Sequence, residues 1–351
     1  MGDGRSGPAA PNENTASPRD PGPTELVTVD VGGTHARFAI AQVAGGRVVA
    51  LGRETTLRTA DHASFRLAWD AYARRFREAE GRDLPRAASI AVASPVGHGV
   101  IRFTNNPWII RPALVPERLH VDRFAFVNDF GAVGHAVAQV GPEHLRHLCG
   151  PEVDLPAEGV ISVVGAGTGL GVAQLVRGAG DYRVIETEGG HVDFAPLDSI
   201  EDALLTRLRA RYRRVSAERI VSGPGLAHIY ETLAAIEGRT ISASDDKTLW
   251  TAAMEGSDSL AAAALDRFCL SLGAVAGDLA LAHGAAGVVI AGGLGLRLAD
   301  HIAQSGFAER FVAKGRFESR MAALPVKLIT HPQPGLLGAA AAFARQHRDP
   351  L

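Results

Sequence analysis

Three glycine-rich turns recur along this chain, and each follows an apolar run that is typical of a β-strand. They are Asp30-Val31-Gly32-Gly33-Thr34, Gly165-Ala166-Gly167-Thr168-Gly169 and Ala291-Gly292-Gly293. Such turns expose bare backbone N–H groups, and the missing side chains let phosphate oxygens approach them closely. Together the three turns predict a nucleotide-binding cleft, which makes phosphoryl transfer the leading hypothesis.

Each turn taken alone could instead be an ordinary β-turn, in which glycine serves only to reach positive φ. A Walker-type loop is excluded because it needs a lysine after its glycines, and no lysine of this chain follows such a loop. The glycines from Gly165 to Gly171 stand at every second position, so they miss the spacing of a dinucleotide-binding helix. What remains is a cradle of hairpin turns from two parts of the chain.

The length of 351 residues is large for a single core and predicts two domains. We expect a disordered tail over residues 1–24, because that segment is rich in Pro, Gly, Asn and Ser. The smaller α/β lobe is expected to comprise residues 25–140 together with the final helical segment, 335–351. The larger α/β lobe is expected to comprise residues 141–334. Each lobe opens with strand-like runs split by glycines, so the pattern indicates a duplicated unit closing around a cleft.

Periodicity and turn residues predict the individual elements of both lobes. Strands are expected over residues 26–31, 37–43, 47–55, 87–93, 124–127, 160–164, 171–176, 183–186 and 287–291. Helices are expected over residues 64–80, 130–140, 200–212, 225–237, 259–283 and 336–345, with a looser segment over 141–156.

The composition indicates which binding partners and which cellular compartment to expect. A formal net charge of -2 shows no basic bias, so nucleic acid is not an expected partner. Cys149 and Cys269 lie far apart, which indicates neither a disulfide framework nor a structural zinc site and favours the reducing cytoplasm. The most apolar stretch, residues 268–296, is interrupted by Asp278 and His283, so no membrane span is expected.

Asp129 follows the apolar run 124–127 and Asn128, which places it at the carboxyl end of a predicted strand. Ligands bind at this edge of open α/β sheets. A carboxylate there can accept the proton of an attacking hydroxyl, as the base does in kinases. Aspartate is also a favoured helix N-cap and a helix is expected to follow, so the sequence leaves both roles open.

Asp30 ends the first predicted strand and could hold a water molecule bound to Mg²⁺, which prefers oxygen ligands and keeps much of its hydration. It could equally cap its own turn. Arg37, just beyond the turn, could neutralise phosphate or be a solvated surface arginine.

Glu188 and His191 flank a flexible glycine pair and could together bind vicinal hydroxyls, because a carboxylate accepts hydrogen bonds and an imidazole donates or accepts them. They could instead ligate a metal, although no third ligand has suitable spacing. Asn105 and Asn128 add amide groups that both donate and accept. Glu218 has an alternative role in the first turn of a helix, where the macrodipole favours acidic residues.

Several motifs carry a resemblance to the bacterial glucokinases of the hexokinase/actin-like superfamily. They are the first glycine turn, Asn128-Asp129-Phe130, the run from Gly165 to Gly171, the run from Glu188 to Pro196, and Ser222-Gly223-Pro224-Gly225. The match extends from about Leu26 to the final helix. It implies an α/β, two-lobed, hexokinase/actin-like (ribonuclease H-like) fold with a cleft between the lobes.

The resemblance also implies an activity: cytoplasmic, ATP-dependent phosphorylation of D-glucose to glucose 6-phosphate, with Mg²⁺, in an enzyme that commonly forms a homodimer. Asp129 is then the base, and the sugar hydroxyls are held by Asn105, Asn128, Glu188, His191 and Glu218. The residues expected around the nucleotide are Asp30, Gly32, Gly33, Thr34, Arg37, Gly165, Gly167, Thr168, Gly169, Gly292 and Gly293. Asp30 is also expected to hold Mg²⁺ through a water molecule.

Two departures from the family pattern stand out. His35 occupies the position after Gly-Gly-Thr where asparagine is expected, and the cysteine-rich zinc motif of the related repressor/kinase group is missing, so the chain resembles the zinc-free branch. Two alternative functions are a sugar-sensing regulator with little catalysis and an actin-like ATPase or acyl kinase. Sugar-stimulated nucleotide turnover separates them from a kinase.

Overall fold

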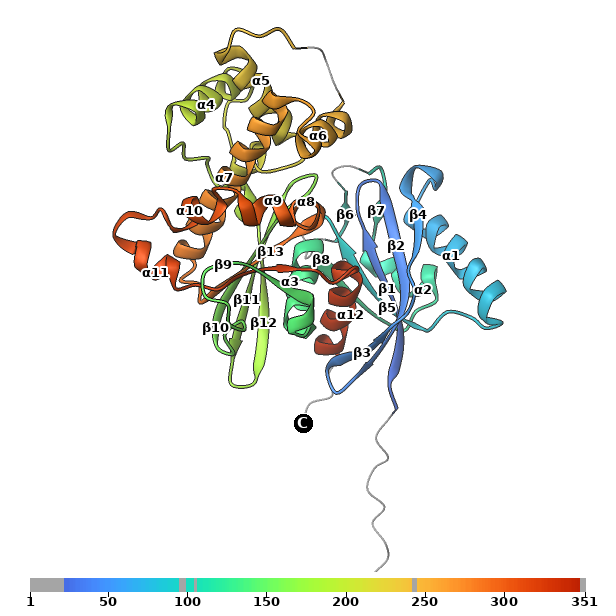
Figure 1. Ribbon diagram of the computed structural model, residues 1–351. Helices are drawn as coiled ribbons and strands as arrows, with labels where there is room; N and C mark the ends of the chain where they lie inside the picture. The colour runs from blue at the N-terminus through green and yellow to red at the C-terminus, as the bar shows by residue number, and fades with distance from the viewer. Residues whose placement is uncertain (1–21, 95–98, 104–105, 242–244, 348–351) are drawn as a thin grey trace, which may run out of the picture.

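The computed structural model describes residues 22–94, 99–103, 106–241 and 245–347. Two six-stranded β-sheets with flanking helices form the two halves of the molecule (Figure 1). Both sheets share one topology, in which the first strand is central, two antiparallel strands follow on one side and two parallel strands lie on the other. The α/β class predicted from the sequence is confirmed.

The first sheet has β1 at its centre and buried on both faces, because helices cover both sides. Its strands, in spatial order, are β3 (Arg47–Leu51), β2 (His35–Ala44), β1 (Thr24–Val31), β5 (Ala87–Val92) and β8 (Arg123–Asn128), and β4 (Thr55–Arg58) also pairs with β2. The accessory elements are η1 (Thr59–Asp61), α1 (Phe65–Glu80), β6 (Ile101–Arg102), β7 (Ile109–Ile110), η2 (Pro112–Leu114) and α2 (Val115–Leu119).

The second sheet repeats this order and adds one antiparallel strand at its edge. Its strands, in spatial order, are β12 (Asp181–Thr187), β11 (Leu170–Gly178), β10 (Gly159–Ala166), β13 (Gly287–Ala291), β14 (Val326–Ile329) and β9 (Leu145–Cys149). The associated helices are η3 (Pro142–His144), η4 (Gly189–His191), α4 (Ser199–Arg211), η5 (Ala217–Arg219), α5 (Gly225–Ile236), α6 (Asp246–Glu255), α7 (Ser259–Ala282), α8 (Gly292–Arg297), α9 (Ala299–Gln304), α10 (Phe307–Val312), η6 (Gly315–Phe317) and α11 (Glu318–Ala322).

Two helices, α3 (Asp129–Gln139) and α12 (Pro334–Gln346), pack against each other between the two sheets (Figure 1). Their backbones approach closely at Gly338, where a Cβ atom would overlap the carbonyl oxygen of Ala132. The hydroxyl of Thr28 on β1 donates to the carbonyl of Leu336, and that of Ser89 on β5 donates to the carbonyl of Ala339. These buried hydrogen bonds fix α12 on the first sheet although it comes last in the chain.

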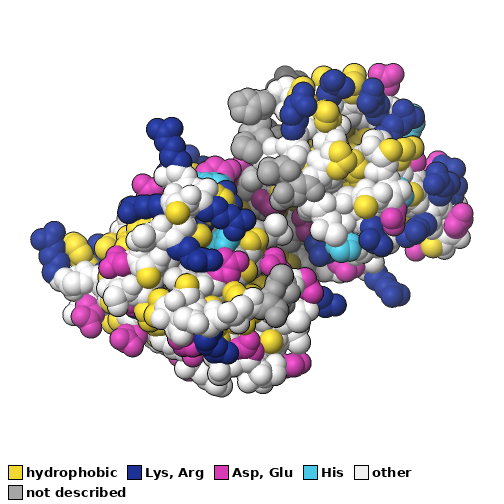
Figure 2. Space-filling view, turned by 90° about the horizontal axis from the view of Figure 1, so that it is seen from above, with side chains coloured by type: hydrophobic (Ala, Val, Ile, Leu, Met, Phe, Trp, Pro, Cys, Tyr) yellow, Lys and Arg dark blue, Asp and Glu magenta, His cyan; other side chains and the backbone are white. Residues whose placement is uncertain are grey.

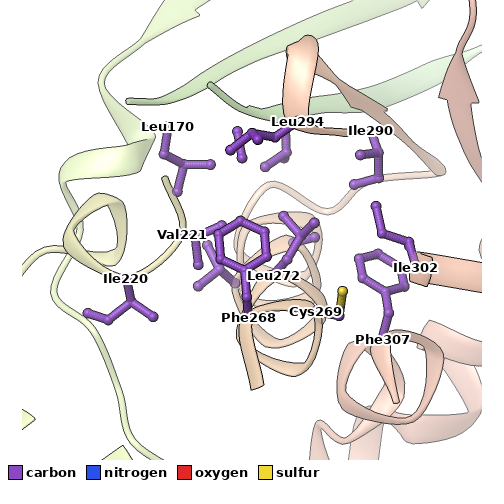
Figure 3. Close-up of a cluster of buried hydrophobic side chains, with 14 of the residues drawn as sticks. Leu170, Ile220, Val221, Phe268, Cys269, Leu272, Ile290, Leu294, Ile302 and Phe307 are labelled. Atoms are coloured by element: carbon purple, nitrogen blue, oxygen red, sulfur yellow. The ribbon is translucent and has the colours of Figure 1, made fainter. Parts of the chain in front are cut away.

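The core of the second half is built around α7. Figure 3 shows Phe268 and Leu272 of this helix among Val221, Ile290 and other buried apolar side chains. By length and composition α7 could cross a membrane, but 72% of its most apolar window is buried inside the fold. We therefore interpret α7 as a core helix. Such a helix is hydrophobic on all sides because neighbouring elements surround it.

The view from above shows the molecule narrowing between its two halves (Figure 2).

Several predicted boundaries differ from the structure. Thr24, predicted as the last residue of the tail, is the first residue of β1. The single strand predicted over 47–55 is divided into β3 and β4, and the segment 141–156, predicted as loose, contains β9 paired with β14. The chain between β13 and α12 also holds short helices and a strand that no strong periodicity indicates.

Candidate active site

The turn from β8 into α3 positions Asp129. The side-chain oxygen of Asn128 accepts hydrogen bonds from the backbone N–H groups of Phe130 (2.9 Å) and Gly131 (3.1 Å), so Asn128 is the N-cap and Asp129 the first helical residue. The Asp129 carboxylate also accepts from the Phe130 N–H, at 2.8 Å. The structure therefore gives the capping role, which the sequence left open for Asp129, to its neighbour.

Burial raises the pKa of Asp129 to about 6, and the negative charges of Asp30 and Glu188 add to the shift. The Phe130 N–H opposes it by stabilising the ionised form. A carboxyl group with this pKa is largely ionised at neutral pH yet a stronger base than an ordinary aspartate, which is the property that general-base catalysis requires.

Asp30 lies at the end of β1, against the first turn of α12. Burial raises the pKa of its carboxyl group, and Arg37 lowers it through an ion pair in which Arg37 Nη1 is 3.3 Å from Asp30 Oδ2. A Cβ atom at Gly335 would lie 2.7 Å from the same oxygen, so the missing side chain of this glycine makes room for the carboxylate. Arg37 is thus held on Asp30 in this structure.

A pocket of about 390 Å³ brings part of the predicted set together, but the glycines of the first two turns and the predicted sugar residues are not in its lining. Its lining includes Asp30, Arg37, Asp129, Gly292, Gly293 and the segment 331–336. The first sheet supplies Asp30 and Arg37, the start of α3 supplies Asp129, and the glycines come from the start of α8. The sequence predictions missed the segment 331–336; its only local signal is the Pro334-Gly335 pair before the last helix.

The first glycine turn is stabilised through its carbonyl groups. The hydroxyl of Thr59 donates to the carbonyl of Gly33 at 2.8 Å, and the Thr59 N–H donates to the carbonyl of Thr34 at 2.9 Å. Gly32 does not have positive φ, so its backbone conformation does not require glycine. Thr34 is exposed at the tip of the turn.

The second glycine turn joins β10 to β11 and packs on the loop before α5. The Gly223 N–H donates to the carbonyl of Gly167 (2.7 Å), and Trp250 Nε1 donates to the carbonyl of Gly223 (3.0 Å). Gly167 has neither positive φ nor any atom within 4 Å of a Cβ position, so the fold itself does not demand a glycine there. Thr168 is exposed beside it.

The other glycines of the predicted nucleotide site differ in how closely neighbouring atoms pack against them. Gly165, predicted as a nucleotide contact, is buried inside β10, where a Cβ atom would lie 2.6 Å from the Phe130 ring and from the Ala291 carbonyl. A Cβ atom at Gly169 would overlap the Glu218 carboxylate. Gly292 has a φ of 84° and a Cβ atom there would lie 2.5 Å from the Ala166 carbonyl oxygen, whereas a Cβ atom at Gly293 would have no atom within 4 Å.

Two of the predicted sugar residues, Glu218 and His191, lie beside the end of the second turn. Glu218 accepts a hydrogen bond from the Leu170 N–H at 2.9 Å, and its other carboxylate oxygen lies 3.9 Å from His191 Nε2. Glu188 and His191 belong to the exposed segment at η4. Asn105 lies outside the described residues. The described part of the chain holds no group of three or more His, Cys, Asp or Glu side chains arranged to bind a metal, so the metal alternative for Glu188 and His191 gains no third ligand.

Comparison with known proteins agrees with this architecture. A family model described as Glucokinase matches residues 27–347. A glucokinase of Zymomonas mobilis subsp. mobilis is 62% identical over 325 residues, which cover 93% of this chain and 99% of that protein. The crystal structure of a glucokinase from an Antarctic psychrotroph, 33% identical, aligns with a TM-score of 0.78 over 91% of this chain and 98% of its own. That of the Balamuthia mandrillaris glucokinase in complex with glucose, 20% identical, aligns with a TM-score of 0.74 over 93% and 95% of the two chains and shows the fold alone.

The predicted family, the two-lobed sugar-kinase fold and the ATP-dependent hexose kinase activity are therefore confirmed. The glycine turns, the strand-end aspartate and the match along nearly the whole chain agree with one another: this chain belongs to the glucokinase family, which phosphorylates glucose with ATP.

Proposed function

We propose that phosphoryl transfer takes place at the pocket lined by Asp30 and Asp129, with Asp129 as the general base. The observation that carries this assignment is the combination of a strand-end position, a buried carboxyl group with a pKa of about 6, and a shared pocket with two glycines of the third turn. The glucose 6-hydroxyl oxygen attacks the γ-phosphorus of ATP in line, the bond to the ADP oxygen breaks, and Asp129 takes the hydroxyl proton.

We propose the glycine turns as the nucleotide site. Gly32, Gly33 and Thr34 would offer backbone donors from one lobe, and Gly167, Thr168 and Gly169 from the other, with Gly292 and Gly293 beside them. The open space at Gly167 supports this proposal, because a ligand that approaches the backbone explains a glycine that neither φ nor packing requires. Gly165 is left out of the contact set because it is buried.

We propose that Asn128, Glu188, His191 and Glu218 hold the sugar hydroxyls, together with Asn105. The cap occupies the side-chain oxygen of Asn128, so its NH₂ group would be the donor to a hydroxyl. Glu218 links this group to the second turn through its hydrogen bond with the Leu170 N–H.

Asp30 fits a magnesium site of the kind found in kinases, in which one carboxylate is joined by water and by substrate phosphates. The described residues offer no cage of several carboxylates, which agrees with a metal that keeps most of its hydration. Mg²⁺ bound there would neutralise charge on the phosphates of ATP. Arg37 holds Asp30 from one side and leaves the second carboxylate oxygen for such a contact.

We propose that one lobe comprises residues 24–140 with α12, that the other comprises residues 141–333, and that the two lobes close on glucose before transfer. Closure would keep water from acting as the acceptor. A cytoplasmic location and a homodimer complete the proposal by analogy with the family. Light scattering coupled to size-exclusion chromatography tests the dimer.

The test of the function is ADP release from MgATP with and without glucose, with mannose, fructose and N-acetylglucosamine as parallel acceptors. Stimulation by glucose, abolished in Asp129→Asn, is the expected result. Glucose binding without ADP release would favour a sensor, and sugar-independent release would favour an ATPase; either would overturn the proposal.

A further inference from the structure

The turn that carries Asp129 is attached to the opposite half of the molecule. β8 is an edge strand of the first sheet, and β12 is an edge strand of the second. The N–H of Asn128, the last residue of β8, donates to Glu186 Oε1 on β12 at 2.8 Å. An edge strand leaves backbone groups without a strand partner. Here a side chain from the other sheet takes that place.

The same carboxylate lies against the first turn of α3. A Cβ atom at Gly131 would lie 2.5 Å from Glu186 Oε1, so a side chain at that position would push Glu186 away. Glu186 is exposed as a whole residue, but partial burial of its carboxylate raises its pKa, and the Asn128 N–H lowers it. Glu186 lies two residues before Glu188 in the sequence, yet it belongs to neither the proposed glucose site nor the proposed nucleotide site.

Phe130 makes a second attachment, immediately after Asp129. A Cβ atom at Gly171 on β11 would overlap the Phe130 ring, and one at Gly165 on β10 would lie 2.6 Å from its tip. The two glycines therefore form a socket in the second sheet that the ring fills. Side chains packed this closely cannot move without a matching change in their neighbours.

We propose that Glu186 and Phe130 are positioning residues for the base. Glu186, through the Asn128 N–H, and Phe130, through its glycine socket, lock the turn that carries Asp129 to the second sheet. The inference rests on the proposed role of Asp129. Because the carboxylate of Asp129 must meet a sugar hydroxyl held largely by the second half of the chain, fixing its turn on that half keeps base and acceptor in register. A misplacement of about 1 Å can lower a rate by roughly 100-fold.

The first experiment compares Glu186→Ala, Glu186→Gln and, as a matched control, Glu158→Ala, an exposed glutamate at the start of the same sheet. Glu186→Ala should lower kcat by roughly 10- to 100-fold and change KM for glucose and ATP by no more than about twofold. Glu186→Gln keeps an acceptor oxygen and should retain kcat within about threefold. Wild-type kcat in Glu186→Ala, or equal losses in the Ala and Gln variants, would overturn the proposal.

A readout independent of activity is hydrogen exchange in a peptide spanning residues 123–139. Glu186→Ala should speed exchange there and leave α4 unchanged; unchanged exchange at 123–139 would contradict the lock. If Asp129→Asn keeps full turnover, the assignment of the base fails, whereas the exchange result still reports whether the lock exists. The two failures are thus distinguishable.

A double-mutant cycle covers the socket, and it remains informative if Glu186→Ala does not fold. Gly171→Ala should lower kcat in the wild-type background, because the added methyl group displaces the Phe130 ring. In a Phe130→Ala background the same change should have little further effect. An equal loss in both backgrounds would show that Gly171 does not act through Phe130 and would remove the socket from the proposal.

Discussion

The carboxylates of Asp30 and Asp129 share one pocket although β5 lies between β1, which carries Asp30, and β8, which ends just before Asp129. The charge of Asp30 helps to raise the pKa of Asp129. The negative charge of Asp30 thereby disfavours ionisation of Asp129. A cation bound at Asp30, as proposed above, would relieve that repulsion, so the proposed nucleotide site and the proposed base would be electrostatically linked.

Replacing Asp129 by Asn should lower kcat by roughly 10²- to 10⁴-fold, the usual contribution of a general base, with KM for glucose little changed. Steady-state kinetics with saturating MgATP measures this.

The Asp129→Asn variant should also be more stable at pH 7, by up to roughly 3 kcal/mol, because the fold raises the pKa of Asp129 from 3.8 to about 6. That destabilising effect is absent below pH 3.8 and complete above about pH 6. A less stable variant would contradict the burial argument.

The pH profile of kcat/KM should fall on the acid side as Asp129 becomes protonated, with a midpoint near its pKa of about 6. Two negative side chains, Asp30 and Glu188, face Asp129 and raise its pKa. Asp30→Asn should therefore move the acid limb to lower pH, whatever it does to the absolute rate. A shift to higher pH would show that another group controls the limb.

Replacing Glu188 by Gln should mainly raise KM for glucose, because a neutral amide accepts hydrogen bonds from sugar hydroxyls more weakly than a carboxylate does. Initial rates over a range of glucose concentrations, with the KM for ATP as internal control, measure the effect. A normal KM for glucose would remove Glu188 from the sugar site.

Gly167→Ala should leave the fold intact, since nothing lies within 4 Å of the added Cβ atom, and should raise KM for ATP by about tenfold if phosphate approaches that backbone. Gly178→Ala is the matched control, because its Cβ position on β11 is equally open but lies at the far end of the hairpin. Equal KM values for ATP in both variants would place the nucleotide elsewhere.

A buried ion-pair network stabilises the second half of the chain. Glu201 on α4 is fully buried, and Arg310 on α10 donates to both of its carboxylate oxygens, at 2.6 and 2.7 Å. Glu201→Ala leaves the Arg310 guanidinium with only its longer pair to Asp198, at 3.5 Å, and should destabilise the fold by about 3–5 kcal/mol. Arg146→Ala, which breaks the exposed pair with Asp300, should cost less than about 1 kcal/mol. Urea unfolding compares the two, and similar losses would refute the assignment.

Much of the local structure follows from the sequence because its causes are short-range. The apolar run before Asn128 predicts a strand, and Asp129 is predicted at its carboxyl end, where the structure has it. The glycine turns are likewise visible from neighbouring residues alone. β14 and α8 escaped prediction because each is short and is stabilised by strands distant in the chain rather than by its own periodicity.

Which chemistry each residue serves depended on contacts that no local pattern encodes. Gly165 and Gly167 look alike in the sequence, yet one accommodates Phe130 and the other faces open space. Asn128 rather than Asp129 became the cap, and Glu186 reached its backbone from a strand 58 residues later. Dihedral preference and periodicity act over a few residues, so most strands, their glycine turns and a carboxylate at a strand end could be read from the sequence alone. The surroundings of each glycine turn and the attachment of the Asp129 turn emerged only in the folded chain, because packing between sheet edges joins residues far apart in the sequence.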